Sequence, residues 1–201
     1  TNPYPPFITS TLQLDASNKL GFSPSRTMSL AQKLYEGVNI NGENKGLITY
    51  MRTDSTNLST QFIEEAKNVI ARDFGEKYVY NSVRTFKNKV KNSQEAHEAI
   101  RPSDPFIKPN DLPASLEQDL KKLYDLIWRR SLSTQASQSL SKIISIKITD
   151  KSNAIILTAS TSELEFDGYK KIYRDDEKNI IKKNQAIDKL TKETLIKKIE
   201  T

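Results

Sequence analysis

The sequence predicts an α+β chain in which a largely helical part, residues 1–137, precedes a β-rich part, residues 138–201. Two observations support this division. Before residue 137, several apolar stretches recur with helical spacing between capping residues and glycines. After residue 138, Ile144, Ile146 and Ile148 alternate with polar residues, which is the two-residue period of a strand with one buried face. With 201 residues, 36% of them hydrophobic, the chain is long enough to bury a core.

Helix-capping signals predict two short helices in tandem near the N-terminus. The Thr-Ser pair at residues 9–10 can cap the first helix, and Gly21 ends it. Ser23 followed by Pro24 fits an N-cap with proline at the first helical position, and Gly37 ends the second helix.

Three further helical segments are expected. One is capped by Ser59, stopped by Gly75 and apolar along one face. Another includes residues 94–100. A third opens at Ser115, which with Gln118 has the spacing of a capping box.

Strands are expected at several positions, the first of them short. Residues 46–51 form a β-favouring run that leads into a polar loop. Residues 150–153 resemble a turn, so 154–158 can return as an antiparallel partner of 144–148. The remaining expectations are a surface loop at 38–45, a turn at 167–168 and strands at 172–173 and 189–199.

Composition excludes several kinds of site and leaves nucleic-acid binding open. The chain has no cysteine, which excludes a disulfide framework, a cysteine-based zinc site and a thiol nucleophile, and weakly indicates a cytoplasmic location. No apolar run approaches the roughly 20 residues that a membrane span requires. The net charge of +6 permits a polyanionic partner, but no basic tail supplies a binding arm.

Tyr50 and Arg52 form a candidate catalytic pair. Strand periodicity places them on the same side of the backbone. A phenol can attack a phosphodiester, and a guanidinium can grip the non-bridging oxygens and stabilise charge that develops at phosphorus. Spacing alone nevertheless favours the simpler interpretation, a core aromatic beside a solvated loop charge.

His97 is the only histidine, and it lies in QEAHEAIRPS, residues 94–103. An imidazole can hold a phosphate or move a proton, although a lone histidine on a helix surface is the commoner case. Glu95 and Glu98 would lie on different faces of a helix, so a metal site is rejected here.

These stretches together resemble bacterial type IA DNA topoisomerases, in the right order along the chain. The matching strings are PFITSTLQ (6–13), KLGF (19–22), AQKLYE (31–36), LITYMRTDS (47–55) and QEAHEAIRPS (94–103). The resemblance covers most of residues 6–130. It changes the interpretation of Tyr50 from a core aromatic to a nucleophile.

The resemblance implies a role for each matching residue. Tyr50 would attack single-stranded DNA and hold its 5′-phosphoryl end as a phosphotyrosine ester, while Arg52 would orient the scissile phosphate. His97 would contact DNA near the break. Thr53, Asp54 and Arg101 also fall on family motif positions and are expected to contact DNA.

The resemblance also implies a larger, cytoplasmic, nucleoid-associated enzyme. Residues 1–137 would form the gate domain with the tyrosine, and residues 138–201 the second half of an arch domain. Neither an acidic Mg²⁺-binding motif of the TOPRIM kind nor a zinc region occurs in this chain, so Mg²⁺ would be bound by a domain absent from it. The partners would be single-stranded and negatively supercoiled DNA and the missing TOPRIM and arch domains, with no membrane. The enzyme would relax DNA without ATP, and the chain alone would be inactive.

Two other functions remain open on the residues themselves. A non-catalytic DNA-binding module would use only the helices and the modest positive charge. A tyrosine recombinase would need an Arg-His-Arg set and would attach to the opposite DNA end, and its motifs are not found.

Overall fold

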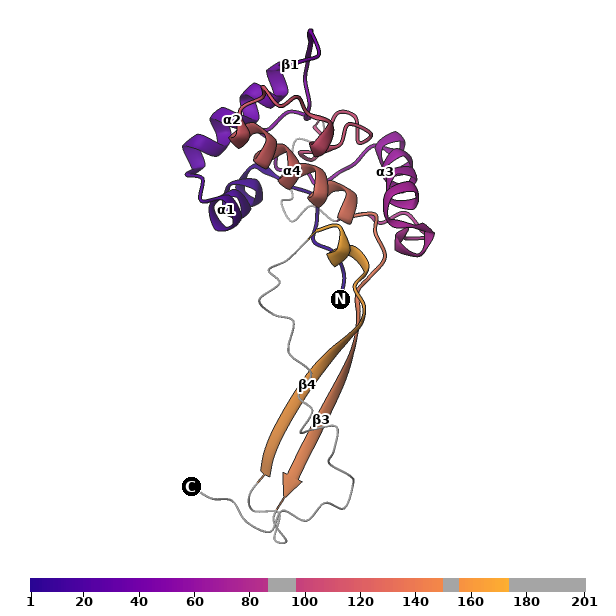
Figure 1. Ribbon diagram of the computed structural model, residues 1–201. Coiled ribbons are helices and arrows are strands. Elements are labelled where there is room, and N and C mark those ends of the chain that lie inside the picture. The colour runs from indigo at the N-terminus through magenta and orange to yellow at the C-terminus, as the bar shows by residue number, and fades with distance from the viewer. Residues whose placement is uncertain (87–96, 150–155, 174–201) are drawn as a thin grey trace.

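The structure is a computed structural model that describes residues 1–86, 97–149 and 156–173. A helical head carries a long two-stranded ribbon that projects away from it (Figure 1). The helices gather in the head and the long strands in the ribbon, and the predicted α+β class is confirmed.

Four α-helices of the described residues form the head, and three of them begin and end near the predicted residues. Their bounds are α1 Thr9–Leu20, α2 Pro24–Glu36, α3 Thr60–Phe74 and α4 Gln118–Ser133. Ser23 and Ser59 accept hydrogen bonds from the backbone N–H groups of Arg26 and Phe62, as N-caps do. Gly21 ends α1 in the left-handed region at φ 71°.

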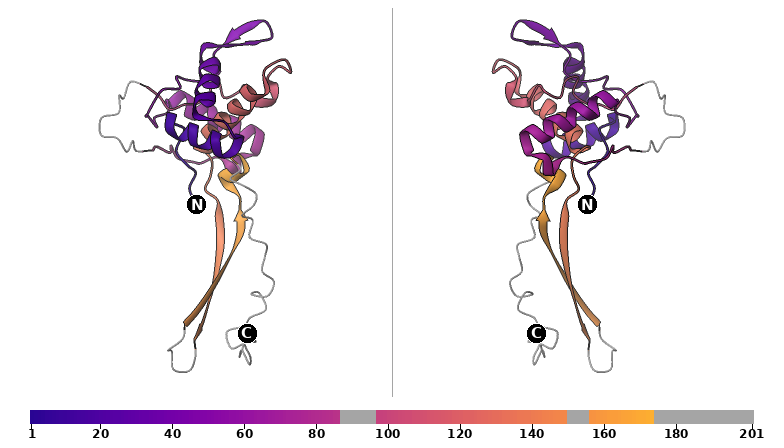
Figure 2. Two further views of the ribbon diagram at one scale, coloured as in Figure 1. Left: turned by 90° about the vertical axis from the view of Figure 1, so that its left-hand side faces the viewer. Right: turned by 90° about the vertical axis from the view of Figure 1, so that its right-hand side faces the viewer.

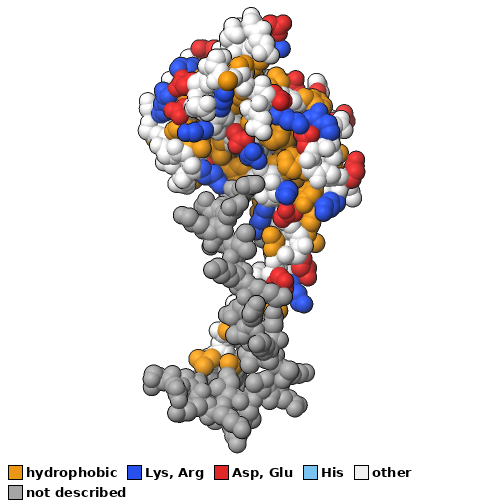
Figure 3. Space-filling view, in the orientation of Figure 1, with side chains coloured by type: hydrophobic (Ala, Val, Ile, Leu, Met, Phe, Trp, Pro, Cys, Tyr) orange, Lys and Arg blue, Asp and Glu red, His pale blue; other side chains and the backbone are white. Residues whose placement is uncertain are grey.

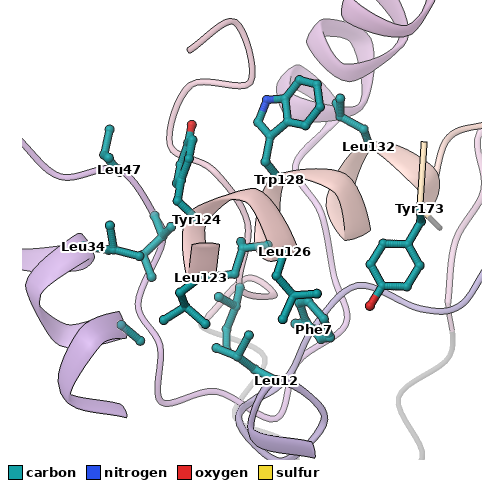
Figure 4. Close-up of a cluster of buried hydrophobic side chains, with 14 of the residues drawn as sticks. Phe7, Leu12, Leu34, Leu47, Leu123, Tyr124, Leu126, Trp128, Leu132 and Tyr173 are labelled. Carbon is teal, nitrogen blue, oxygen red and sulfur yellow. The ribbon is translucent and has the colours of Figure 1, made fainter. Parts of the chain in front are cut away.

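The α4 helix runs through the middle of the head and supplies much of its core (Figure 4). Tyr124 and Trp128 are buried on it. The Tyr124 hydroxyl donates to the Ile107 carbonyl at 2.8 Å, and the Trp128 indole N–H donates to the Pro105 carbonyl at 2.9 Å. These two bonds hold the proline-rich segment before α4 against the helix, because buried polar groups of aromatic side chains require partners.

A short β-hairpin occupies the stretch expected to be a surface loop. Its strands are β1 Val38–Ile40 and β2 Glu43–Lys45, paired antiparallel. Asn41 and Gly42 form the tip with φ 53° and 93°. Two consecutive positive φ values are typical of the tight turns that match strand twist, and Asn-Gly is the favoured pair. The hairpin projects from the head at the end opposite the ribbon (Figure 2).

The ribbon confirms the predicted antiparallel pairing. It consists of β3 Leu140–Thr149 and β4 Ile156–Phe166, with Ile144 opposite Thr161. Apolar side chains on it remain exposed, Ile143 at 71% among them.

The chain returns from the ribbon into the head through a 3₁₀ helix, η3 Gly168–Lys171. Ile172 and Tyr173, expected to form a strand, follow this turn and are buried in the core of the head. The Tyr173 hydroxyl donates to Asp15, and Arg130 donates to Asp15 at 3.2 Å and to the Pro5 carbonyl at 2.7 Å. Burial raises the pKa of Tyr173. Burial of Ile172 and Tyr173 against residues distant in the sequence therefore outweighs their intrinsic preference for a strand.

Four other local expectations are wrong. Neither Thr9 nor Ser10 caps α1, because both lie inside the helix and Ile8 occupies its N-cap position. Residues 46–51 form no regular strand, and 97–100 form no helix; each makes only isolated bridges. The α4 helix begins at Gln118 after Glu117, so Ser115 is not its cap. Residues 94–96, 150–153 and 189–199 lie outside the described residues.

Both signs of charge are interspersed over the face of the head seen in Figure 3. None of the described helices is both long and apolar enough to cross a membrane.

Candidate active site

Three segments that are distant in the sequence meet at the site. Phe7 forms a bridge with Ile100, and Ile48 forms a bridge with Pro102. The N–H of Thr49 donates to the Arg101 carbonyl at 2.9 Å. The segment that follows His97 therefore runs between the N-terminal segment and the segment that carries Tyr50.

Side chains alternate along the tyrosine segment. Met51 and Thr53 are buried, with 4% and 8% of their surface exposed. Tyr50 is half-buried, and Arg52 and Asp54 are exposed. The burial of Met51 and Thr53 and the exposure of Arg52 and Asp54 alternate as a strand would predict, but the segment bends at residues 49, 51 and 52 and is not a regular strand.

The Tyr50 ring lies between two other rings. Its centroid is 5.4 Å from that of Tyr35, on the last turn of α2, in an edge-on arrangement. On another side it is 5.5 Å from the imidazole of His97. The ring also packs against the core of the head. These contacts fix the ring, while its partial exposure keeps it within reach of a ligand.

A pocket of about 470 Å³ lies beside this aromatic group. Its lining comes from the start of α1, the residues after Tyr50, and His97: Ile8, Thr9, Ser10, Gln13, Arg52, Thr53, Asp54 and His97. Four of the six predicted site residues therefore line one cavity. Tyr50 does not line it but contacts His97, which does.

Arg52 is exposed at the wall of this pocket. Among residues 1–86, 97–149 and 156–173, its guanidinium has no ion-pair or hydrogen-bond partner. An exposed guanidinium at a pocket wall retains its planar fork for phosphate oxygens.

Arg101 is occupied by protein groups. It donates to Glu98 at 2.6 and 3.1 Å and to the Pro102 carbonyl at 2.8 Å, and it stacks over the Phe62 ring. Burial by itself raises the pKa of Glu98, but hydrogen bonds and charge from Arg101 and the Ser59 amide outweigh it, so the pKa is lowered. A DNA contact by Arg101 stays a prediction, and its present bonds serve to hold the loop before Pro102.

Sequence reasoning did not single out Thr9, Ser10 and Gln13, which form the α1 side of the pocket. They belong to PFITSTLQ, one of the strings on which the family resemblance rests. Only their place in that string could have indicated that these residues belong to the site, because helix periodicity gives no reason to place them near Tyr50.

A search for metal ligands within the described ranges finds no group of three or more His, Cys, Asp or Glu side chains able to hold an ion. The described residues therefore offer no ligand set that fits Mg²⁺.

A family model described as DNA topoisomerase matches residues 1–201. The chain belongs to this family. DNA topoisomerase 1 of Rickettsia bellii is 48% identical over 173 residues, which are 86% of this chain and 22% of that protein. DNA topoisomerase 1 of Campylobacter jejuni is 44% identical over 185 residues, 92% of this chain and 26% of that protein. The resemblance to bacterial type IA enzymes is confirmed.

The topoisomerase fold is also found in a solved structure. Full-length topoisomerase I from Thermotoga maritima matches with a TM-score of 0.74 and 41% identity, over 87% of this chain and 28% of that chain. This topoisomerase chain thus spans about a quarter of the length of its relatives.

Proposed function

We propose that this chain is the part of a type IA topoisomerase that cleaves single-stranded DNA through Tyr50. The observation that carries the proposal is the position of the half-buried Tyr50 ring against His97, at the edge of a pocket that Arg52 also lines. Family membership supports it, since the fold is shared with topoisomerases of known structure.

The proposed reaction is a transesterification. The phenolic oxygen of Tyr50 attacks a backbone phosphorus, so a tyrosyl O–P bond forms and the P–O3′ bond breaks. The phenol gives up its proton, and the 3′ oxygen takes up a proton and leaves as a hydroxyl. The 5′ end is then held as a phosphotyrosine ester. Attack by the 3′-hydroxyl reverses the step, and no ATP is needed because the ester conserves the bond.

The neighbours of Tyr50 have distinct parts in this step. Arg52 binds the non-bridging phosphate oxygens and stabilises the charge that grows as phosphorus becomes five-coordinate. His97 contacts the DNA strand near the break. Thr53 and Asp54 line the same pocket, and we propose that they contact the DNA backbone there.

The whole reaction cycle needs groups beyond the described residues. We propose that the rest of the polypeptide supplies a TOPRIM domain that binds Mg²⁺ and the remaining arch. With them, the enzyme passes one strand through the break and relaxes negatively supercoiled DNA in the bacterial cytoplasm. The chain alone is expected not to relax DNA.

The alternative is a DNA-binding module without covalent chemistry. Both functions predict binding of single-stranded DNA, but only the first predicts a covalent adduct. The test uses the full-length enzyme with end-labelled single-stranded DNA and Mg²⁺, followed by denaturation. We expect label on the protein when the DNA is labelled at its 3′ end, because that fragment carries the 5′ phosphate. DNA labelled at its 5′ end should instead give a free fragment that ends in a 3′-hydroxyl.

Tyr50→Phe is the deciding variant. It keeps the ring contacts with Tyr35 and His97, so stability should change by about 1 kcal/mol or less. The adduct should disappear while noncovalent binding of the DNA remains, because the only attacking oxygen is gone. A wild-type yield of adduct from Tyr50→Phe would assign the nucleophile to another residue.

A further inference from the structure

We propose that two threonine hydroxyls, those of Thr49 and Thr9, position the tyrosine segment for cleavage. This inference rests on the proposed function and extends it to two residues that bond to the backbone of the segments around Tyr50. Each hydroxyl both donates to and accepts from the backbone of a segment distant in sequence.

Thr49 ties the segment to the loop that follows His97. Its hydroxyl donates to the Ala99 carbonyl at 2.7 Å and accepts from the Arg101 N–H at 3.0 Å. Its own backbone N–H donates to the Arg101 carbonyl at 2.9 Å. Thr49, the residue directly before Tyr50, is thus bonded to Ala99 and Arg101, which follow His97 by two and four residues.

Thr9 ties the other end of the same segment to α1. Its hydroxyl donates to the Met51 carbonyl at 2.8 Å and accepts from the Thr53 N–H at 2.9 Å. Its backbone N–H donates to the Thr53 carbonyl at 2.9 Å. Thr9 is the first helical residue of α1, after the N-cap position Ile8, so its hydroxyl is not engaged in capping the helix.

The hydroxyls take the place of a regular sheet. The tyrosine segment has no continuous ladder, only the isolated bridge between Ile48 and Pro102. The hydroxyl of Thr49 and the backbone groups of residues 51 and 53 make these bonds, whereas Tyr50 is half-buried and Arg52 is exposed. The positions of the Tyr50 and Arg52 side chains therefore depend on the bonds that hold the backbone of residues 49–53.

Small errors of position are costly in such a reaction. A displacement of about 1 Å between reacting groups can lower a rate on the order of 100-fold. Thr→Val keeps the shape of the side chain but removes its hydrogen bonds, and it leaves the amide and carbonyl partners unsatisfied. Thr→Ser keeps the hydroxyl and removes only a methyl group.

The test measures single-turnover cleavage of single-stranded DNA by the full-length enzyme. We expect Thr49→Val to slow cleavage by about 10- to 100-fold, with Kd for the DNA, measured in a Tyr50→Phe background, changed by less than about threefold. Thr49→Ser should restore the rate to within about threefold of wild type. Thr9→Val should slow cleavage in the same range, which provides a second variant if Thr49→Val does not fold.

Thr27→Val is the matched control. Thr27 is fully buried, and its hydroxyl donates to the Ser23 carbonyl within the first turn of α2. Its loss should affect the melting temperature but not the cleavage rate. Wild-type cleavage by folded Thr49→Val or Thr9→Val would overturn the positioning role, as would cleavage by Thr49→Ser as slow as that by Thr49→Val. If Tyr50→Phe still formed adduct, the proposed function itself would fail, which is a separate result.

Discussion

The ring of Tyr50 contacts the imidazole of His97 with centroids 5.5 Å apart, although the two residues belong to segments that make no regular secondary structure together. The contact places an exposed imidazole, which lines the pocket, beside the proposed nucleophile. Two of the predicted site residues are therefore in direct contact. Different effects are expected when the residues around this contact are changed.

Arg52→Lys should depress cleavage more than DNA affinity. Lysine retains the positive charge but loses the planar two-pronged contact with phosphate oxygens. We expect the single-turnover cleavage rate of the full-length enzyme to fall on the order of 10-fold, while Kd changes by less than about threefold. A normal cleavage rate would show that charge alone is sufficient at this position.

His97→Ala should weaken binding of single-stranded DNA near the break. The imidazole lines the pocket and is exposed, so its loss removes a contact of about 1 kcal/mol, or roughly fivefold in Kd. Fluorescence anisotropy across a salt titration separates this effect from general charge. If the variant bound DNA as tightly as wild type at every salt concentration, His97 would make no DNA contact and would only pack against Tyr50.

The Glu98 carboxylate should make the loop after His97 sensitive to acid. The pKa of Glu98 is lowered in the folded state, so its stabilising contribution is complete above the unfolded value, about 4.3, and is lost as pH falls through the folded value. Melting temperatures recorded from neutral pH to below about pH 4 should decline more steeply for wild type than for Glu98→Gln.

Glu98→Gln itself should lower stability near neutral pH, because Arg101 then keeps a neutral acceptor in place of a carboxylate. Identical acid profiles for the two proteins would show that the Glu98–Arg101 pair is not linked to folding.

Gly168→Ala should disrupt the return of the chain from the ribbon to the head. Gly168 has φ 52°, and an added Cβ would lie 2.2 Å from the backbone carbonyl oxygen of Gln138. A backbone clash at a left-handed position should cost about 2–4 kcal/mol. Gly21→Ala is the matched control, since Gly21 has φ 71° and open space around it, and should cost only about 1 kcal/mol. Equal losses of unfolding free energy in denaturant titrations would contradict the steric argument.

Much of the local structure could be predicted from short stretches of sequence. Ser23 with Pro24 and Ser59 predicted the starts of α2 and α3, and the glycines after each helix predicted the ends of α1, α2 and α3, because caps act within one turn of the residue that provides them. Ser115 failed as a cap because it lies in a turn, closed by the bond from the Leu116 N–H to the Pro113 carbonyl, and the helix begins only at Gln118. The strand expected at 172–173 failed because burial against Arg130 and Asp15 outweighs intrinsic β propensity.

The sequence by itself determined the fold class and the family resemblance. Only the tertiary structure decided that His97 meets Tyr50, that α1 lines the pocket, and that Thr49 and Thr9 hold the tyrosine segment. The reason is the range of the forces involved. Periodicity and capping act over a few residues, whereas these contacts join segments that are held together only when the core of the whole head is packed.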